Sequence, residues 1–235
     1  VVASLPLAEF NKQKGDFKEY LENFDAHVVL YDGSQEINRR VQFKHAAIFP
    51  QGVAAAHYIL NQNHSYVTDN LTFAVIDIGM KTLDVVVIEI DDGLEIIESM
   101  SFGFDIGISL IHENLYRVVQ DVADLSLGVP ELDAILRNKG KWSNYDFSEA
   151  IEDGKKELLR MVNDGISERW GDAQKQRLDK IFLVGGGGQL LFPEFKENKK
   201  FSFIRNNIEL PMNPRFANAY GCLLVANEIE KLVLE

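Results

Sequence analysis

Residues 73–90 have the sequence FAVIDIGMKTLDVVVIEI, in which two apolar runs flank a polar turn that contains Asp77, Gly79 and Thr82. Apolar runs of this length that are rich in β-branched residues and bounded by turn residues indicate buried strands. A third apolar run at residues 94–102 follows the turn DDG. We therefore expect three antiparallel strands joined by short connections.

The turn between the first two runs has residues suited to binding phosphate. Gly79 lets a ligand approach the backbone, and the N–H groups of the turn can form an anion-binding nest. The Thr82 hydroxyl can donate to a phosphate oxygen, Lys81 can add positive charge, and Asp77 can hold Mg²⁺ through water. The same residues also suit a plain hairpin turn, so the motif alone leaves both interpretations open.

A second glycine-rich segment, at residues 185–188, follows the apolar run at residues 180–184 and precedes a predicted short helix. Consecutive glycines allow a flat ligand such as adenosine to lie against the backbone. They also leave the N-terminus of the next helix free for polar contacts. The alternative is a flexible loop, which would be entropically costly inside a compact domain.

Two further segments predict helices that begin with small residues. The helix predicted at residues 50–60 starts with Pro50, a favoured first-turn residue. Gln51 follows it and could orient a water for attack on a γ-phosphate, although, taken alone, an ordinary capped helix explains it better. The alanines at 54–56 predict close packing against a neighbour. The last predicted helix, at residues 214–234, also begins with small residues, in the segment PRFANAYG.

The rest of the pattern predicts a mixed α/β protein. Further strands are expected at residues 26–31 and 36–43 as a hairpin and at 44–49, and further helices at 16–21, 105–120, 131–137 and 147–170. In the longest helix an apolar stripe at helical spacing indicates core contact, and it consists of Leu158, Leu159, Val162 and Ile166.

Composition limits the class of protein. The 235 residues, 46% of them hydrophobic, suffice for one or two domains with a substantial core. The formal net charge of −12 disfavours direct nucleic-acid binding. A single cysteine, Cys222, suits a reducing cytoplasm, and no apolar run reaches the roughly 18 residues of a membrane helix. The chain starts with Val1 rather than Met, so we expect the natural protein to begin further upstream.

In their order along the chain, the four motifs resemble the actin, DnaK-type chaperone and sugar-kinase superfamily. The segments FPQGVAAA at 49–56, IDIG at 76–79 and FANAYG at 216–221 are similar to the ParM/StbA plasmid-partition actins and the related archaeal actin-like proteins. SLPL at residues 4–7 is similar to the segment that closes the sheet of the first lobe in those proteins. The resemblance covers essentially the whole chain.

The resemblance implies an RNase H-like, actin-like α/β fold in which helices flank a mixed sheet and a nucleotide lies between two lobes. Residues 1–61 would be the remainder of the first lobe with its connecting helix. Residues 62–213 would be the second lobe, with a helical insertion at about 103–178, and residues 214–235 a helix that returns to the first lobe. The first-lobe N-terminal portion would be absent.

The resemblance also implies a role for each motif residue. Gln51 would position the attacking water and Asp77 would assist Mg²⁺. The residues implied to contact the nucleotide, which is ATP with GTP as the alternative, are Gly79, Lys81, Thr82, Gly107, Lys155, Gly185, Gly186 and Gly187. A solvated helix face explains Lys155 and its neighbour Lys156 equally well.

One departure from the family pattern concerns its first phosphate motif, a strand–turn–strand near the N-terminus, which this sequence does not show. Half of the phosphate clamp is therefore expected to be missing. On this basis the chain alone should bind nucleotide poorly and hydrolyse ATP inefficiently.

The implied function is that of the C-terminal part of a cytoplasmic actin-like ATPase that slowly hydrolyses ATP and forms filaments for plasmid segregation or a cytoskeletal role. Its partners would be further copies of itself and a DNA-binding adaptor protein, with no direct contact to nucleic acid or membrane. Two alternatives are a chaperone or sugar-kinase relative and a non-catalytic membrane-linked scaffold. The acidic tail at residues 227–235 disfavours an anchor for anionic lipid.

Overall fold

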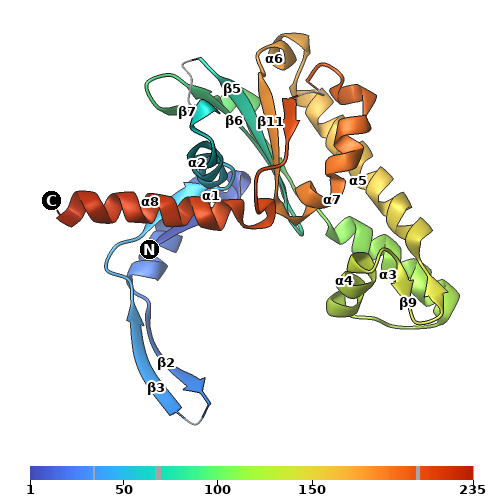
Figure 1. Ribbon diagram of the computed structural model, residues 1–235, viewed down its shortest axis with the longest axis horizontal. Helices are drawn as coiled ribbons and strands as arrows, with labels where there is room; N and C mark the ends of the chain where they lie inside the picture. The colour runs from blue at the N-terminus through green and yellow to red at the C-terminus, as the bar shows by residue number, and fades with distance from the viewer. Residues whose placement is uncertain (34, 67–69, 205–206, 235) are drawn as a thin grey trace.

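The computed structural model describes residues 1–33, 35–66, 70–204 and 207–234, and a mixed sheet lies at its centre (Figure 1). The strand order is β12-β11-β5-β6-β7, with β8 also pairing with β6. The bounds are β5 (Thr72–Ile78), β6 (Leu83–Ile90), β7 (Leu94–Ile96), β8 (Phe102–Phe104), β11 (Lys180–Val184) and β12 (Ile208–Glu209). β5 runs antiparallel to β6 and parallel to β11.

Both faces of the central strands are buried, which explains their nearly continuous apolar sequence. Along β5, Ala74 and Ile76 belong to the larger apolar cluster on one face, whereas Phe73 and Val75 belong to the cluster on the other. This alternation follows from the two-residue period of a strand. The predicted pair of buried strands is thereby confirmed.

The third predicted strand is interrupted between β7 and β8 by the turn η2 (Glu98–Met100). Ser101 causes the break, because its Oγ accepts the Val87 amide at 2.9 Å, a backbone donor that would otherwise face a strand partner. The same hydroxyl donates to the Ile97 carbonyl oxygen at 2.9 Å. A side chain thus replaces a ladder hydrogen bond at this position.

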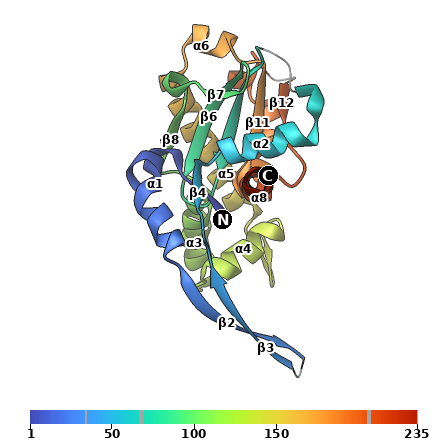
Figure 2. The same ribbon diagram turned by 90° about the vertical axis from the view of Figure 1, so that its left-hand side faces the viewer.

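Helices cover both faces of the sheet (Figures 1 and 2). One face carries α3 (Ser109–Ala123), α4 (Val129–Arg137), α5 (Ser148–Arg169) and α7 (Gly185–Glu197), with α6 (Asp172–Gln176) and the small hairpin of β9 (Lys141–Trp142) and β10 (Tyr145–Asp146) at the periphery. The predicted stripe of α5 lies in this core, with Leu158, Val162 and Ile166 buried and Leu159 packed at its edge.

The opposite face carries α2 (Val53–Gln62), across which α8 (Ala217–Leu234) runs. A Cβ on Gly221 would overlap the carbonyl oxygen of Ala54, so the two helix backbones touch. Only a glycine permits this approach. The close packing predicted from the alanines at 54–56 is confirmed.

The N-terminal part of the chain forms a smaller structure. β1 (Val2–Leu5) pairs in parallel with β4 (Ala47–Pro50), and α1 (Leu7–Glu22) lies between them in sequence. β2 (Asp25–Asp32) and β3 (Gln35–Gln42) form the predicted antiparallel hairpin, which projects from the body (Figures 1 and 2). The helix predicted at 16–21 is longer than expected, because it begins directly after Pro6.

Three element boundaries differ from the prediction. Pro50 ends β4 instead of opening a helix, because the chain first turns at Gly52, where φ is +84°. The glycines at 185–188 form the first turn of α7 rather than a loop, since the helix begins directly after β11. The helix predicted at 105–120 begins only at Ser109, because the preceding residues pack against the β5–β6 turn.

After α2 the chain forms the single turn η1 (His64–Tyr66), and residues 67–69 lie outside the described part of the chain. None of the described helices combines the length and the apolar composition needed to cross a membrane.

Candidate functional site

The turn between β5 and β6 is held rigidly by its own backbone and by the segment that precedes α3. The Gly79 amide donates to the Thr82 carbonyl oxygen at 2.9 Å, which closes the turn. The Ile108 amide donates to the Gly79 carbonyl oxygen at 3.1 Å and the Ser109 amide to that of Met80 at 2.8 Å. A Cβ on Gly107 would lie 2.7 Å from the Gly79 oxygen, so the backbone of Gly107 packs directly against the turn.

Two carboxylates face each other below this turn, because Asp77 and Asp84 are paired residues of the β5–β6 ladder. Asp77 is 7% exposed, and its Oδ2 accepts the side-chain amide of Asn218 at 2.5 Å. Asp84 is 2% exposed, and its Oδ1 accepts the Leu7 amide at 2.9 Å. The second oxygen of Asp84 has no hydrogen-bond partner among the described residues.

Burial controls the protonation of both carboxyls. It raises the pKa of Asp77, and the hydrogen bond from Asn218 only partly opposes this effect. Burial also raises the pKa of Asp84, to about 6, against the hydrogen bond from Leu7 and with a smaller contribution from the charge of Asp77. Burial thus disfavours the charged form of both carboxyls, and a bound cation would oppose this effect.

The glycines at the start of α7 differ in what surrounds them. A Cβ on Gly185, where φ is +78°, would lie 2.5 Å from Asp77 Oδ1, and one on Gly187 would overlap the side chain of Ile78. Both residues must therefore be glycine for α7 to begin against β5. Gly186 differs, because no described atom lies within 4 Å of a Cβ placed on it.

A cavity of about 710 Å³ lies beside these two features. The β5–β6 turn contributes Gly79, the start of α7 contributes Gly186 and Gly187, and α5 contributes Lys155. This volume suits a small-molecule ligand such as a nucleotide. The predicted site residues that do not line the cavity are Gln51, Asp77, Lys81, Thr82, Gly107 and Gly185.

Lys155 is a half-buried cation in the wall of this cavity. Its Nζ lies 3.0 Å from Glu152 Oε1 and 3.2 Å from Glu194 Oε1. Although burial opposes it, hydrogen bonds to these two carboxylates raise the pKa of Lys155. Lys156 points away and pairs with Asp153 on the exposed face of α5, so a solvated face accounts for Lys156.

Two residues of this region were missed in the sequence. Arg215, in the turn η5 (Pro214–Phe216), lines the cavity. Asn218 contacts two elements, since its Oδ1 accepts the Gly52 amide at 2.9 Å while its Nδ2 donates to Asp77. Both lie in the PRFANAYG segment, which indicated only close packing, so the sequence carried no signal that would separate them from their neighbours.

Gln51 lies at the turn between β4 and α2, where its amide donates to the Leu5 carbonyl oxygen at 2.7 Å. Through the neighbouring Gly52 it is connected to Asn218 and hence to Asp77. The two residues predicted to be catalytic thus come from different elements and are linked by a third.

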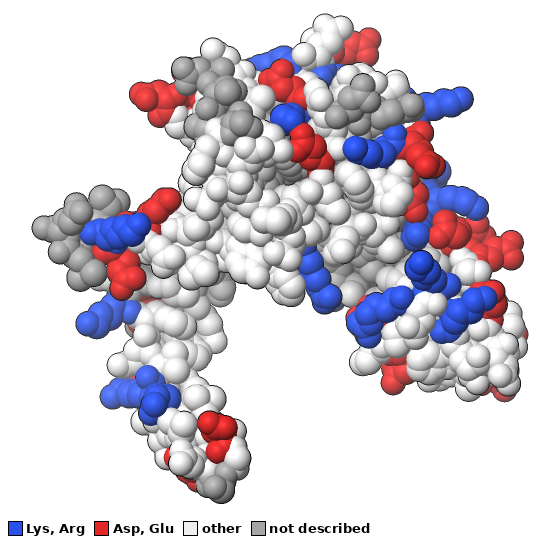
Figure 3. All heavy atoms as spheres, viewed as in Figure 1, with Lys and Arg blue, Asp and Glu red and all other residues white. Residues whose placement is uncertain are grey.

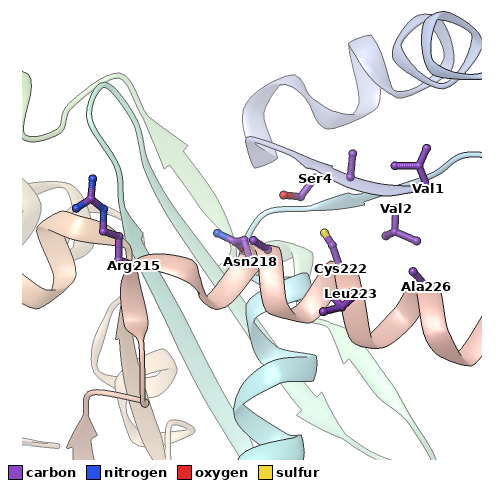
Figure 4. Close-up of a pocket in the computed structure, with 10 residues that line it drawn as sticks. Val1, Val2, Ser4, Arg215, Asn218, Cys222, Leu223 and Ala226 are labelled. Atoms are coloured by element: carbon purple, nitrogen blue, oxygen red, sulfur yellow. The ribbon is translucent and has the colours of Figure 1, made fainter. Parts of the chain in front are cut away.

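A second hollow of about 580 Å³ lies between β1 and α8 and is shown in Figure 4. Its wall includes Val1, Val2 and Leu223, and Ser4 and the buried Cys222 face each other across it. Burial raises the pKa of the Cys222 thiol, so it stays protonated at neutral pH. The rest of its wall is mostly apolar, apart from Arg215 of η5 and Asn218 of α8.

Charged side chains on one face of the molecule lie mainly towards its margins (Figure 3). Acidic and basic side chains are mixed there, and the middle of this face is largely uncharged. The net charge of −12 is therefore not gathered into one acidic patch on this face.

Residues 75–197 match the protein family described as archaeal actin homologue MreB-like, C-terminal. An archaeal actin homologue of Thermoplasma volcanium is 26% identical over 226 residues, which are 92% of this chain and 64% of that protein. The chain therefore spans less than two thirds of the length of this curated relative.

Solved structures share the fold. A non-polymerisable quadruple mutant of pCBH ParM superimposes with a TM-score of 0.83 and 26% identity, over 97% of this chain and 67% of that one. The archaeal actin homologue Ta0583 in complex with ADP gives a TM-score of 0.79 and 24% identity, over 96% of this chain and 70% of that one. The expected fold, a mixed sheet flanked by helices as in these proteins, is confirmed.

Proposed function

This chain belongs to the archaeal MreB-like actin homologue family, and from that premise we propose that it forms the nucleotide-binding body of an actin-like ATPase. The observation that carries the proposal is that Gly79 of the β5–β6 turn and Gly186 and Gly187 of α7 line the same cavity. A turn suited to phosphate and a helix start suited to adenosine are brought together there.

In this proposal the adenosine of ATP, or the guanosine of GTP, lies against Gly186 and Gly187. Lys155 and Arg215 flank it from α5 and η5. The phosphates extend towards Gly79, with Thr82 and Lys81 of the same turn beside them. Gly107 and Gly185 act indirectly, by allowing the backbone approaches that shape the turn and the start of α7.

Asp77 is the residue proposed to assist Mg²⁺, because it is a carboxylate near the end of β5, just before the β5–β6 turn. No group of three or more His, Cys, Asp or Glu side chains among the described residues could hold a metal by itself. Mg²⁺ keeps several waters and needs only one or two carboxylates, so Asp77 would assist it through water. When bound, the ion would neutralise phosphate charge.

Gln51 is proposed to orient the attacking water, since a neutral amide can accept from water without competing for the proton.

The residues that build the site come from the proposed units 1–61, 62–213 and 214–235. We further propose that the whole protein acts in the cytoplasm, self-associates into filaments for plasmid segregation or a cytoskeletal role, and attaches to DNA through an adaptor. One solved neighbour, the pCBH ParM mutant, is described as non-polymerisable.

Titration calorimetry of Mg-ATP, Mg-ADP and Mg-GTP into this chain tests nucleotide binding, with Gly186→Val as the informative variant. A Cβ at Gly186 would meet no described atom within 4 Å, and Gly186 lines the cavity, so the fold should persist while the affinity falls by at least about tenfold.

Gly15→Val is the matched control, because Gly15 of α1 also has no described atom within 4 Å of an added Cβ and lies away from the cavity. Equal affinities of both variants would place any nucleotide outside this cavity. If the wild-type chain bound none of the three nucleotides, nucleotide binding by this chain would be refuted.

A further inference from the structure

We propose that Asn218 is a positioning residue that holds the Gln51–Gly52 turn and the Asp77 carboxylate in one arrangement, so that hydrolysis depends on it more than nucleotide binding does. This inference rests on the proposed function, because it concerns the residues assigned there to the attacking water and to Mg²⁺. Asn218 lies in the first turn of α8, near Ser4 of β1 (Figure 4).

Both ends of the Asn218 amide are used, and the chemistry of its partners sets its orientation. The Gly52 N–H can only donate, so the atom facing it at 2.9 Å is the oxygen Oδ1. That leaves the nitrogen Nδ2, which donates, to face Asp77 Oδ2 at 2.5 Å. A carboxylate at position 218 could accept from Gly52 but would repel Asp77.

On one side, Asn218 fixes a turn that is already constrained. Gly52 has a φ of +84°, and a Cβ on it would lie 2.8 Å from the Val86 side chain. The Gln51 amide is held by the Leu5 carbonyl oxygen of β1 at 2.7 Å, and the next amide is held by Asn218. The backbone around Gln51 therefore has one anchor on β1 and one on α8.

On the other side, Asn218 fixes a buried carboxylate. Asp77 Oδ2 accepts from Asn218, while Oδ1 faces Gly185 at the start of α7. A buried carboxylate that loses its donor either rotates to find another or is destabilised. Asn218 thus sets the orientation of Asp77 and the position of Gln51 with a single side chain.

The nucleotide cavity does not include Asn218 in its wall. Replacing Asn218 should therefore disturb the relative placement of Gln51 and Asp77 while leaving most of the surface that contacts the nucleotide unchanged. The turnover number kcat and the dissociation constant Kd for Mg-ADP should therefore respond differently. For Asn218→Ala we expect kcat to fall at least about tenfold while the Kd for Mg-ADP changes less than about threefold.

The experiment measures phosphate release from ATP, the Kd for Mg-ADP by titration calorimetry, and the thermal unfolding midpoint. The variants are Asn218→Ala, Asn218→Asp and a double variant, called the exchange, that combines Asp77→Asn with Asn218→Asp. Asn218→Asp should have the lowest thermal midpoint, because two carboxylates then face each other. The exchange restores a donor–acceptor pair with reversed polarity, so the midpoint should recover while kcat stays low, since position 77 no longer carries a carboxylate.

Asn114→Ala is the matched control, because the Asn114 amide donates to the Ala150 carbonyl oxygen at 2.8 Å in the α3–α5 contact, away from Gln51 and Asp77. Asn114→Ala should lower the thermal midpoint without lowering kcat more than it changes the Kd for Mg-ADP. If Asn218→Ala behaves as this control does, Asn218 is merely structural and the inference is overturned. If the wild-type chain binds nucleotide but releases no phosphate, the proposed hydrolysis and this inference both fall.

Discussion

Asp84 lies beneath the β5–β6 turn and connects it to the N-terminal part of the chain. Its Oδ1 accepts the Leu7 amide, one of the amides that α1 leaves without an intrahelical partner. Its Oδ2 is buried without a hydrogen-bond partner in the described part of the protein. Asp84 therefore stabilises the start of α1, and its charge is held in a poorly solvated place.

The pH dependence of folding should reveal this burial in the absence of metal and nucleotide. Burial raises the pKa of Asp84 from 3.8 to about 6, so the folded state binds this proton more tightly than the unfolded state does. The contribution of Asp84 to stability is thus fully present below pH 4 and is lost as the pH rises to about 6. Asp84→Asn keeps an acceptor for the Leu7 amide and should remove this loss, which amounts to roughly 3 kcal/mol at most.

Urea unfolding between pH 4 and pH 7 with EDTA present would measure this effect. Asp146→Asn is a suitable control, because hydrogen bonding to Lys141 lowers the pKa of the exposed Asp146 to about 2, below the window of interest. A wild-type chain and an Asp84→Asn variant with the same slope of unfolding free energy against pH would show that Asp84 is not the group responsible.

The packing of α2 against α8 is the contact most sensitive to side-chain size at the scale of elements. Gly221 lies against the backbone of Ala54, and the side chains of Ala55 and Ala56 are fully buried beside it. Because backbone atoms cannot move aside as a flexible side chain can, an added methyl group must separate the two helices.

Gly221→Ala should therefore destabilise the protein by about 1–3 kcal/mol, although alanine has the higher helix propensity. Gly15→Ala on α1 should have the opposite sign, since its methyl group meets no described atom and helix propensity alone acts there. Denaturant unfolding of the two variants measures both signs at once. A stabilised Gly221→Ala variant would contradict the helix contact described above.

At the scale of the whole molecule, a ligand that bridges the β5–β6 turn and α7 should stabilise the fold. Binding at about 100 times the Kd adds about 2.7 kcal/mol, which for a chain of this size raises the unfolding midpoint by roughly 5–10 °C. Thermal scans with ADP and Mg²⁺ should show this shift, and EDTA should reduce it if Asp77 assists the metal.

The variant Gly186→Val provides the control for these scans, because it should lose most of the shift while Gly15→Val keeps it. Equal shifts for both variants would mean that the stabilising ligand binds elsewhere on the molecule. Shifts that do not respond to EDTA would argue against a role of Mg²⁺.

Local sequence patterns were sufficient for the elements that have strong periodicity or distinct turn chemistry. The strands β5, β6 and β11, the hairpin of β2 and β3, and the apolar stripe of α5 follow from the order of apolar and turn residues along the chain. These features depend on neighbours in sequence, so a pattern can reveal them. The motif order likewise sufficed to identify the resemblance that the comparisons bear out.

Tertiary structure decided the features that depend on contacts between distant segments. Pro50 lies in β4 because the chain needs the Gly52 turn before α2, and β7 ends because Ser101 takes the place of a ladder partner. The convergence of Gly79, Lys155 and Gly186 on one cavity required the parallel pairing of β11 with β5. Asn218 acquired its two partners only when α8 crossed α2, a contact between segments more than 140 residues apart that no local pattern encodes.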